Sequence, residues 1–106
     1  MGHVQVLLNM LAFHYHPQAA LDSPRICIGA GSSETGKPVV YVEEGINAKA
    51  IEGLAKMGHK VKVLSGWERG GMFGRGQLIR CHYDDGKLVY SAGSDLRGDG
   101  MAIPML

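Results

Sequence analysis

The feature that most constrains the fold is a run of apolar residues near the start of the chain. Four of them follow the spacing of one helical face: Val4, Leu7, Leu8 and Leu11. Others stand at positions around the rest of the same helix: Val6, Met10 and Phe13. A helix that is apolar on nearly all sides is normally buried on several sides. A chain of 106 residues has difficulty covering such a helix, so the sequence predicts an apolar surface that needs a partner.

Size and charge exclude several classes of protein. A length of 106 residues suits one small domain, and we predict a single domain over residues 1–106. The formal net charge of +1 gives no field that attracts nucleic acid or an anionic membrane, so we expect neither as a partner. No stretch reaches the ~20 apolar residues of a membrane-spanning helix. No Lys or Arg precedes the apolar residues 4–13, which favours a helix of the fold over a signal peptide. The sequence therefore does not assign a cellular compartment.

A strand–helix–strand unit is predicted for residues 39–64. Residues 39–42 are a continuous β-prone run, which is typical of a strand buried on both faces. Asn47 is a favourable N-cap, and Gly58 is a typical residue at the end of a helix, so a helix is expected between them. Residues 60–63 alternate between lysine and valine, which predicts a strand with one solvent-facing side.

The remaining elements are short. Pro17 favours the start of a second helix, because proline is well placed at a first helical position. Residues 25–28 are predicted to form a strand. The two β-prone runs at residues 77–83 and 87–91 enclose Asp84-Asp85-Gly86, a sequence that predicts a hairpin. The expected fold class is therefore α/β (α+β), with two or three helices and about five strands.

Two histidines raise the question of a metal site. His14 and His16 flank Tyr15 near the end of the first predicted helix. Residues two apart do not share a helical face, and a zinc site needs further ligands. His3 and His82 would join them only through tertiary contacts. We therefore expect no metal, and we interpret the histidines as residues at a helix C-terminus, where positive charge is favourable.

The glycine-rich segment at residues 70–76 resembles a phosphate-binding loop only at first sight. It lacks the GK[ST] ending of a P-loop, and Ile79 stands where a dinucleotide fingerprint has its third glycine. It also precedes a strand, whereas anion-binding glycine loops open a helix. We expect a structural loop. The alternative is a standalone binding module in which the glycine loops and Arg75 or Arg97 hold a small anion.

Carboxylates cluster in the glycine-rich tail, where Asp95, Arg97 and Asp99 lie close together in the sequence. Paired carboxylates can perform acid–base chemistry or bind a metal. Aspartate in a glycine-rich loop more often forms a turn through hydrogen bonds from the backbone to its side chain. We therefore predict a turn at this position.

Nucleophiles give no catalytic pattern. Cys27 and Cys81 lie in apolar runs without a CxxC spacing, so we predict buried, unreactive thiols. The serines form no G-x-S-x-G motif. From the residues alone we expect no catalytic, cofactor-binding or metal-binding residue and no cofactor. The pattern indicates an α/β domain that is incomplete.

The order of the motifs resembles that of the γ-glutamyltranspeptidase family. Six segments carry the resemblance in chain order: residues 2–10, 16–25, 40–45, 54–63, 74–79 and 93–100. The first resembles the helix that follows the family's active-site glycine pair. The second, HPQAALDSPR, resembles the family's next segment, NPQ-AAL-D-x-PR. The resemblance extends over essentially the whole chain, and its form is most similar to the subgroup of bacteria and fungi.

This resemblance implies part of a four-layer αββα Ntn-hydrolase sandwich. The family's precursor cuts itself to expose an N-terminal threonine, which attacks the γ-glutamyl amide of glutathione or related compounds. The α-amino group of that threonine can act as the base. The acyl group then passes to water or to an amine, while two adjacent glycines stabilise the oxyanion.

The resemblance also implies that the catalytic groups lie outside this chain. Gly2 matches the position after the glycine pair, so the pair is expected just before residue 1. Thr35, the only threonine, is internal and does not match the nucleophile motif. We therefore expect a fragment of the family without catalysis of its own. Its expected partners are the missing catalytic part or further copies of itself.

Overall fold

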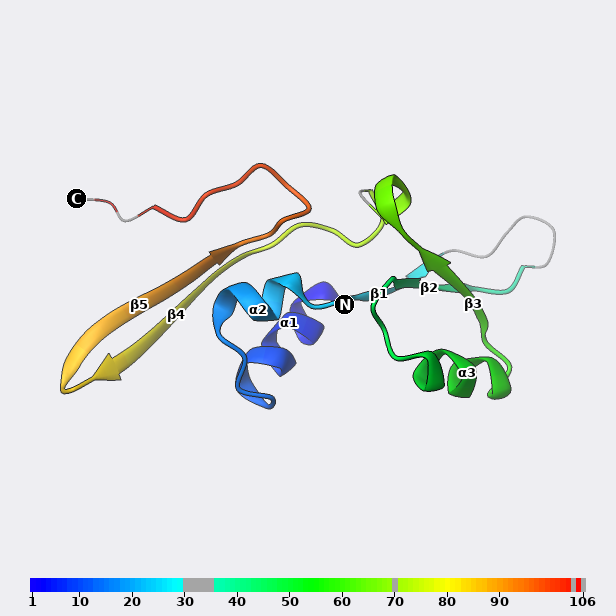
Figure 1. Cartoon of the computed structure of the whole chain (residues 1–106), viewed down its shortest axis with the longest axis horizontal. Helices are drawn as coiled ribbons and strands as arrows, with labels where there is room; N and C mark the ends of the chain where they lie inside the picture. The colour runs from blue at the N-terminus through cyan, green and yellow to red at the C-terminus, as the bar shows by residue number, and fades with distance from the viewer. Residues whose placement is uncertain (30–35, 70, 104, 106) are drawn as a thin grey trace. The chain divides into compact units, whose positions relative to one another are not determined.

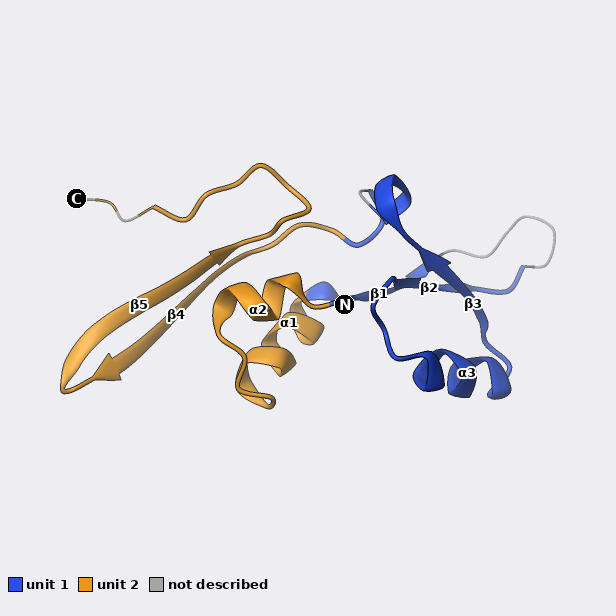
Figure 2. Cartoon of the chain, viewed as in Figure 1, with its two compact units in different colours: residues 1–2, 24–73 blue, residues 3–23, 74–106 orange. Residues whose placement is uncertain are grey.

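The computed structural model describes residues 1–29, 36–69, 71–103 and 105, and the chain divides into two compact units (Figures 1 and 2). Unit 1 comprises residues 1–2 and 24–73, and unit 2 comprises residues 3–23 and 74–106. The elements follow in the order α1 (Gly2–Leu11), α2 (Pro17–Asp22), β1 (Ile26–Gly29), β2 (Val39–Glu43), α3 (Ala48–Lys56), β3 (Lys60–Leu64), the 3-10 turn η1 (Gly66–Arg69), β4 (Gln77–Asp84) and β5 (Lys87–Ser94). Within the described ranges, three α-helices and five strands confirm the predicted α/β (α+β) class.

Unit 1 is built on a three-stranded sheet in the order β1-β2-β3 (Figure 1). β1 runs antiparallel to β2, and β3 runs parallel to it after the α3 crossover, which confirms the predicted strand–helix–strand unit. Asn47 is the N-cap of α3, because its Oδ1 accepts a hydrogen bond from Lys49 N at 2.8 Å. Past the helix end, Gly58 has a φ of 94°, a conformation that glycine adopts at little cost.

The central strand β2 carries the core of unit 1. Val39, Val40 and Val42 are all buried, which confirms the prediction of a strand covered on both faces. The alternation predicted for β3 is only partly correct, because Lys60 and Lys62 are exposed as expected but Val63 is exposed as well. Val61 on the same face is half-buried, so the described layers cover the valine face of this edge strand only in part.

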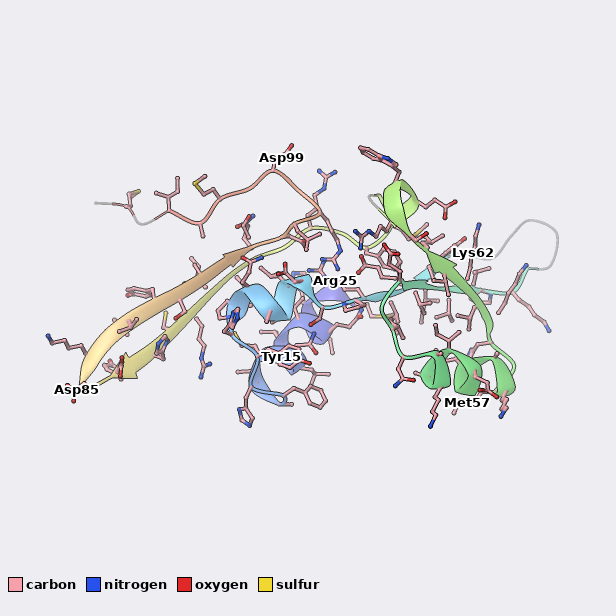
Figure 3. All side chains as sticks on the ribbon, viewed as in Figure 1. Tyr15, Arg25, Met57, Lys62, Asp85 and Asp99 are labelled. Carbon is pink, nitrogen blue, oxygen red and sulfur yellow. The ribbon has the colours of Figure 1, made fainter. Side chains whose placement is uncertain are left out.

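Unit 2 contains an antiparallel hairpin of β4 and β5. The predicted turn is confirmed at its tip, where Asp85 and Gly86 have φ values of 50° and 77°, the condition for a type I′ turn (Figure 3). The second strand is longer than predicted, since it continues through Ala92 and Gly93 to Ser94. These small residues have little intrinsic strand propensity, and they are held by pairing with the start of β4.

The core of unit 2 lies between α1, α2 and the hairpin. Its buried members are Val6, Met10, Ala20 and Leu21, with the half-buried Leu78 of β4 packed against them. α2 begins at Pro17, as predicted. The other apolar side chains in and just after α1 are exposed: Val4, Leu7, Leu8, Leu11 and Phe13. The described part of the chain therefore leaves most of this apolar helix uncovered.

Candidate functional site

A buried polar cluster lies where β5 ends. Asp95 Oδ1 accepts hydrogen bonds from Arg97 N at 3.0 Å and from Arg97 Nη1 at 2.9 Å. Its Oδ2 accepts a hydrogen bond from Gly76 N at 2.9 Å. This is a turn organised by an aspartate side chain, which confirms the predicted turn. Asp99 is exposed farther along the tail (Figure 3).

The guanidinium of Arg97 is directed at the end of α2. Nη1 donates to Leu21 O at 2.8 Å, and Nη2 donates to Ser23 O at 3.2 Å. Carbonyl groups at a helix C-terminus lack partners within the helix, and a positive charge there is favourable. Because Arg97 makes these bonds within its own unit, its geometry does not support the alternative of an anion-binding role.

Gln18 links α2 to the end of the hairpin in a way that the sequence analysis missed. Its Nε2 donates to Ser94 O at 2.9 Å, and its Oε1 accepts from Ser94 N at 3.0 Å. The side-chain amide thus pairs with β5 as a neighbouring strand would. Close approach is possible because residue 93 is glycine: a Cβ at Gly93 would lie 2.9 Å from Gln18 Cα. Gln18 and Ser94 are 76 positions apart in the sequence. The available signal was that both residues lie in segments that resemble the family, residues 16–25 and 93–100.

A buried pair of charged residues in unit 1 was also not predicted from the sequence. Arg25 and Glu43 are both buried at the end of the β1–β2 pair. Glu43 Oε1 accepts from Arg25 N at 2.8 Å, and Glu43 N donates to Arg25 O at 2.9 Å. Arg25 Nη1 donates to Phe73 O at 3.2 Å, so Arg25 also holds the segment before β4. A glutamate directly after the apolar run at residues 39–42 was the available signal.

The interpretation of the histidines is wrong. α1 ends at Leu11, so His14 and His16 follow the helix and are not in its last turn. His16 is instead the N-cap of α2, where its Nδ1 accepts from Ala19 N at 3.3 Å. The chain reverses between the two helices at His14, which has a φ of 60°. Among the described residues, no three His, Cys, Asp or Glu side chains gather as metal ligands would.

The structure tests the prediction for the two cysteines, and it describes all of the glycine-rich segment at residues 70–76 except Gly70. Cys27 is half-buried and Cys81 is exposed, so the prediction that both are buried is wrong. Cys81 lies on a two-stranded sheet, which cannot bury both faces with one helix layer. Arg75 is exposed and lies beside Gly98. Thr35 and Gly70 are outside the described residues.

Both buried clusters use their charged groups for hydrogen bonds within the same unit. They tie strand ends to α2 or to the segment before β4, which is a structural arrangement. Among the described residues, no helix is long and apolar enough to cross a membrane.

Comparison with known proteins gives a consistent result. The chain matches the family model "Gamma-glutamyltranspeptidase" over residues 1–105. It is similar to the crystal structure of cephalosporin acylase from Bacillus halodurans, with a TM-score of 0.72 and 37% identity over 94% of this chain and 17% of that one. It is similar to an acivicin-inhibited γ-glutamyltranspeptidase, with a TM-score of 0.69 and 18% identity over 93% of this chain and 47% of that one. No match was found among curated proteins.

A third solved structure agrees with these two. The γ-glutamyltranspeptidase from Pseudomonas nitroreducens complexed with L-DON has a TM-score of 0.66 and 23% identity over 99% of this chain and 49% of that one. The chain therefore spans less than half of the length of each of these three structures.

Proposed function

The chain belongs to the γ-glutamyltranspeptidase family, and we propose that it supplies structural layers to a γ-glutamyl-transferring enzyme and has no catalysis of its own. The fold is part of the family's Ntn-hydrolase αββα sandwich. In the complete enzyme, the proposed activity is hydrolysis or transfer of the γ-glutamyl group of glutathione and related amides. The missing catalytic part is the proposed partner.

The uncovered surface of α1 carries this proposal. Only Val6 and Met10 of this apolar helix are buried, while Val4, Leu8 and Leu11 are exposed. Contiguous apolar surface of this kind marks an interaction site in a soluble protein. A catalytic part with an apolar face would cover the helix and complete its burial.

The chemistry of the chain supports the second half of the proposal. The family's nucleophile is an N-terminal threonine that uses its own α-amino group as base. Thr35 is the only threonine here, and it stands inside the sequence. Gly2 matches the position after the oxyanion glycine pair. The nucleophile and the oxyanion donors would therefore come from the catalytic part.

A role in maturation is also proposed. The acivicin-inhibited γ-glutamyltranspeptidase has a structure that reveals critical roles for its C-terminus in autoprocessing and catalysis. The present chain resembles the C-terminal end of the family. We infer that it contributes in the same way when the catalytic part is present, by holding the sandwich in the conformation in which the precursor cuts itself.

Two assays test the proposal. The purified chain, incubated with γ-glutamyl-p-nitroanilide, is expected to release no nitroaniline, and measurable turnover would contradict the claim that it is inert alone. In the second assay, the chain is co-expressed with a γ-glutamyltranspeptidase that lacks this end. Activity is expected to return with the wild-type chain and with the exposed-surface control Lys60→Glu, but not with Leu8→Lys on α1. Failure of the wild-type chain to restore activity would overturn the structural role.

A further inference from the structure

The N-cap of α2 is a histidine, and its hydrogen bond depends on the protonation state of the imidazole ring. His16 Nδ1 accepts a hydrogen bond from Ala19 N at 3.3 Å, while His16 O accepts one from Ala20 N at 3.0 Å. A neutral imidazole accepts at Nδ1 when its proton is on Nε2, whereas both nitrogens of an imidazolium are donors. Protonation of His16 therefore removes the acceptor that caps α2.

The first turn of α2 makes Ala19 N dependent on this one side chain. Pro17, at the first helical position, has no N–H group. Gln18 N lies against β5, since a Cβ at Gly93 would stand 2.9 Å from it. Ala19 N is the next donor along the turn, and among the described residues its hydrogen bond is accepted by His16 Nδ1 alone.

A proton on His16 also places a positive charge at the unfavourable end of the helix. The N-terminus of a helix carries a partial positive charge, so a cation there is repelled. The side chain of His16 is exposed, so a proton from water reaches the ring without any rearrangement of the fold. The lost acceptor and the repulsion act in the same direction, and both destabilise the first turn of α2.

We propose that His16 makes the junction between α2 and the hairpin sensitive to pH, intact at neutral pH and weakened in mild acid. The first turn of α2 contains Gln18, whose side-chain amide pairs with the backbone of Ser94 at the end of β5. α2 has only six residues, so fraying of one turn affects most of the helix.

The direction of the effect follows from which form of the ring each state accepts. The folded chain favours neutral His16, because only the neutral ring caps the helix, whereas the unfolded chain accepts the proton without this cost. An imidazole in water gains its proton near pH ~6.5. The stability of unit 2 is therefore complete above this range and falls as the pH falls through it.

Other titratable or charged groups surround α2. Side chains that alternate with Leu78 and Gly93 face α2 from the hairpin, and four of them are charged or titratable: Arg80, His82, Asp84 and Lys87. The rest lie on α1, on the connection to α2, on α2 itself and at its C-terminal end: His3, His14, Tyr15, Asp22, Asp95 and Arg97. His82 can add acid sensitivity of its own, because its Nδ1 is buried without a hydrogen-bond partner among the described residues. All of these groups are also present in a His16 variant, so their contribution cancels when that variant is compared with the wild type.

Two substitutions of the full chain isolate the cap. His16→Asn keeps a side-chain acceptor that does not titrate, and His16→Ala has no cap at any pH. Urea unfolding is followed at about pH 5 and about pH 8, on either side of the histidine range. The amide NMR signals of Ala20 and Ser94 serve as the readout, because both residues belong to unit 2.

The wild-type chain is expected to resemble His16→Asn at the higher pH and His16→Ala at the lower pH. Relative to His16→Asn, its folding equilibrium constant should fall about fivefold between the two conditions, the effect of losing one N-cap. His14→Asn is the matched control: His14 is exposed and has a φ of 60°, which asparagine tolerates. This variant should keep the pH dependence of the wild type.

The hydrogen bond itself is tested by nitrogen-15 NMR of the imidazole ring. At the higher pH, Nδ1 of His16 should be unprotonated, and the amide shift of Ala19 should follow the titration of the ring. A proton on Nδ1 at this pH would contradict the cap. Parallel stability profiles of the wild type and His16→Asn would overturn the proposal, as would a His14→Asn chain that loses the pH dependence. Every measurement uses the chain alone, so the result is independent of the catalytic partner.

Discussion

Arg97 and Asp95 form a buried ion pair, with 2.9 Å between Nη1 and Oδ1 and with side chains only 3% and 1% exposed. The same guanidinium caps the carbonyl groups of Leu21 and Ser23. The same carboxylate accepts from Gly76 N, just before β4. One pair therefore joins the end of α2, the start of β4 and the tail after β5.

Replacing one member of this pair should destabilise unit 2 strongly. Arg97→Met leaves the buried carboxylate of Asp95 without its counter-charge, and breaking a buried pair in this way costs about 3 kcal/mol or more. Urea denaturation of the variant measures the change in the free energy of unfolding. The control Arg80→Met removes an exposed guanidinium and should stay within about 0.5 kcal/mol of the wild type. Equal effects of the two substitutions would contradict the structural role of the pair.

Gly93→Ala should also destabilise unit 2. A Cβ at this position would lie 2.9 Å from both Gln18 N and Gln18 Cα, which are backbone atoms that cannot move aside without shifting α2. Overpacking of this kind costs about 2 kcal/mol. Thermal unfolding of the variant gives the magnitude. A midpoint equal to that of the wild type would mean that α2 does not approach β5 as closely as described.

Gly53→Ala should have the opposite effect. Gly53 lies inside α3, and a Cβ there would meet nothing within 4 Å. Alanine in a helix interior is favoured over glycine by about 0.8 kcal/mol, because glycine loses more backbone freedom on folding. The variant should therefore unfold at higher denaturant concentration than the wild type. A loss of stability would show that α3 packs against something at this position.

The N-cap of α3 offers a fourth test. Asn47→Ala removes the acceptor for Lys49 N and should cost about 1 kcal/mol. Asn47→Asp keeps an acceptor oxygen in the same place and should retain the stability. Amide hydrogen exchange in α3 is the direct measurement, since the effect is local. Equal exchange in the two variants would rule out a capping role for this side chain.

Features that depend on a few neighbouring residues were predictable from the sequence. Pro17 and Asn47 mark helix starts, because the free N–H groups of a first helical turn are satisfied or removed by residues within that turn. Asp85-Gly86 marks the hairpin, since a two-residue turn with two positive φ angles admits few residue types. The valines of β2 indicated a strand buried on both faces, and this is confirmed.

Features that depend on distant segments were not predictable in the same way. The pairing of Gln18 with Ser94 joins residues 76 positions apart. The exposure of Cys81 follows from the absence of a layer over one face of the hairpin in the described structure, which an apolar run in the sequence does not reveal. His16 was misinterpreted because the end of α1 was placed too late, and its capping role appears only with the true start of α2.

The sequence by itself determined the family, the fold class and the local turns and caps, because these depend on residue order and on backbone chemistry within a few positions. It also indicated that α1 is too apolar for a chain of this length to cover. Only the tertiary structure decided which charges are buried together and which face of the hairpin lies open. Those outcomes depend on which distant segments meet, and the free energy of a buried Arg97 or an exposed Tyr90 is set by what stands next to it in space.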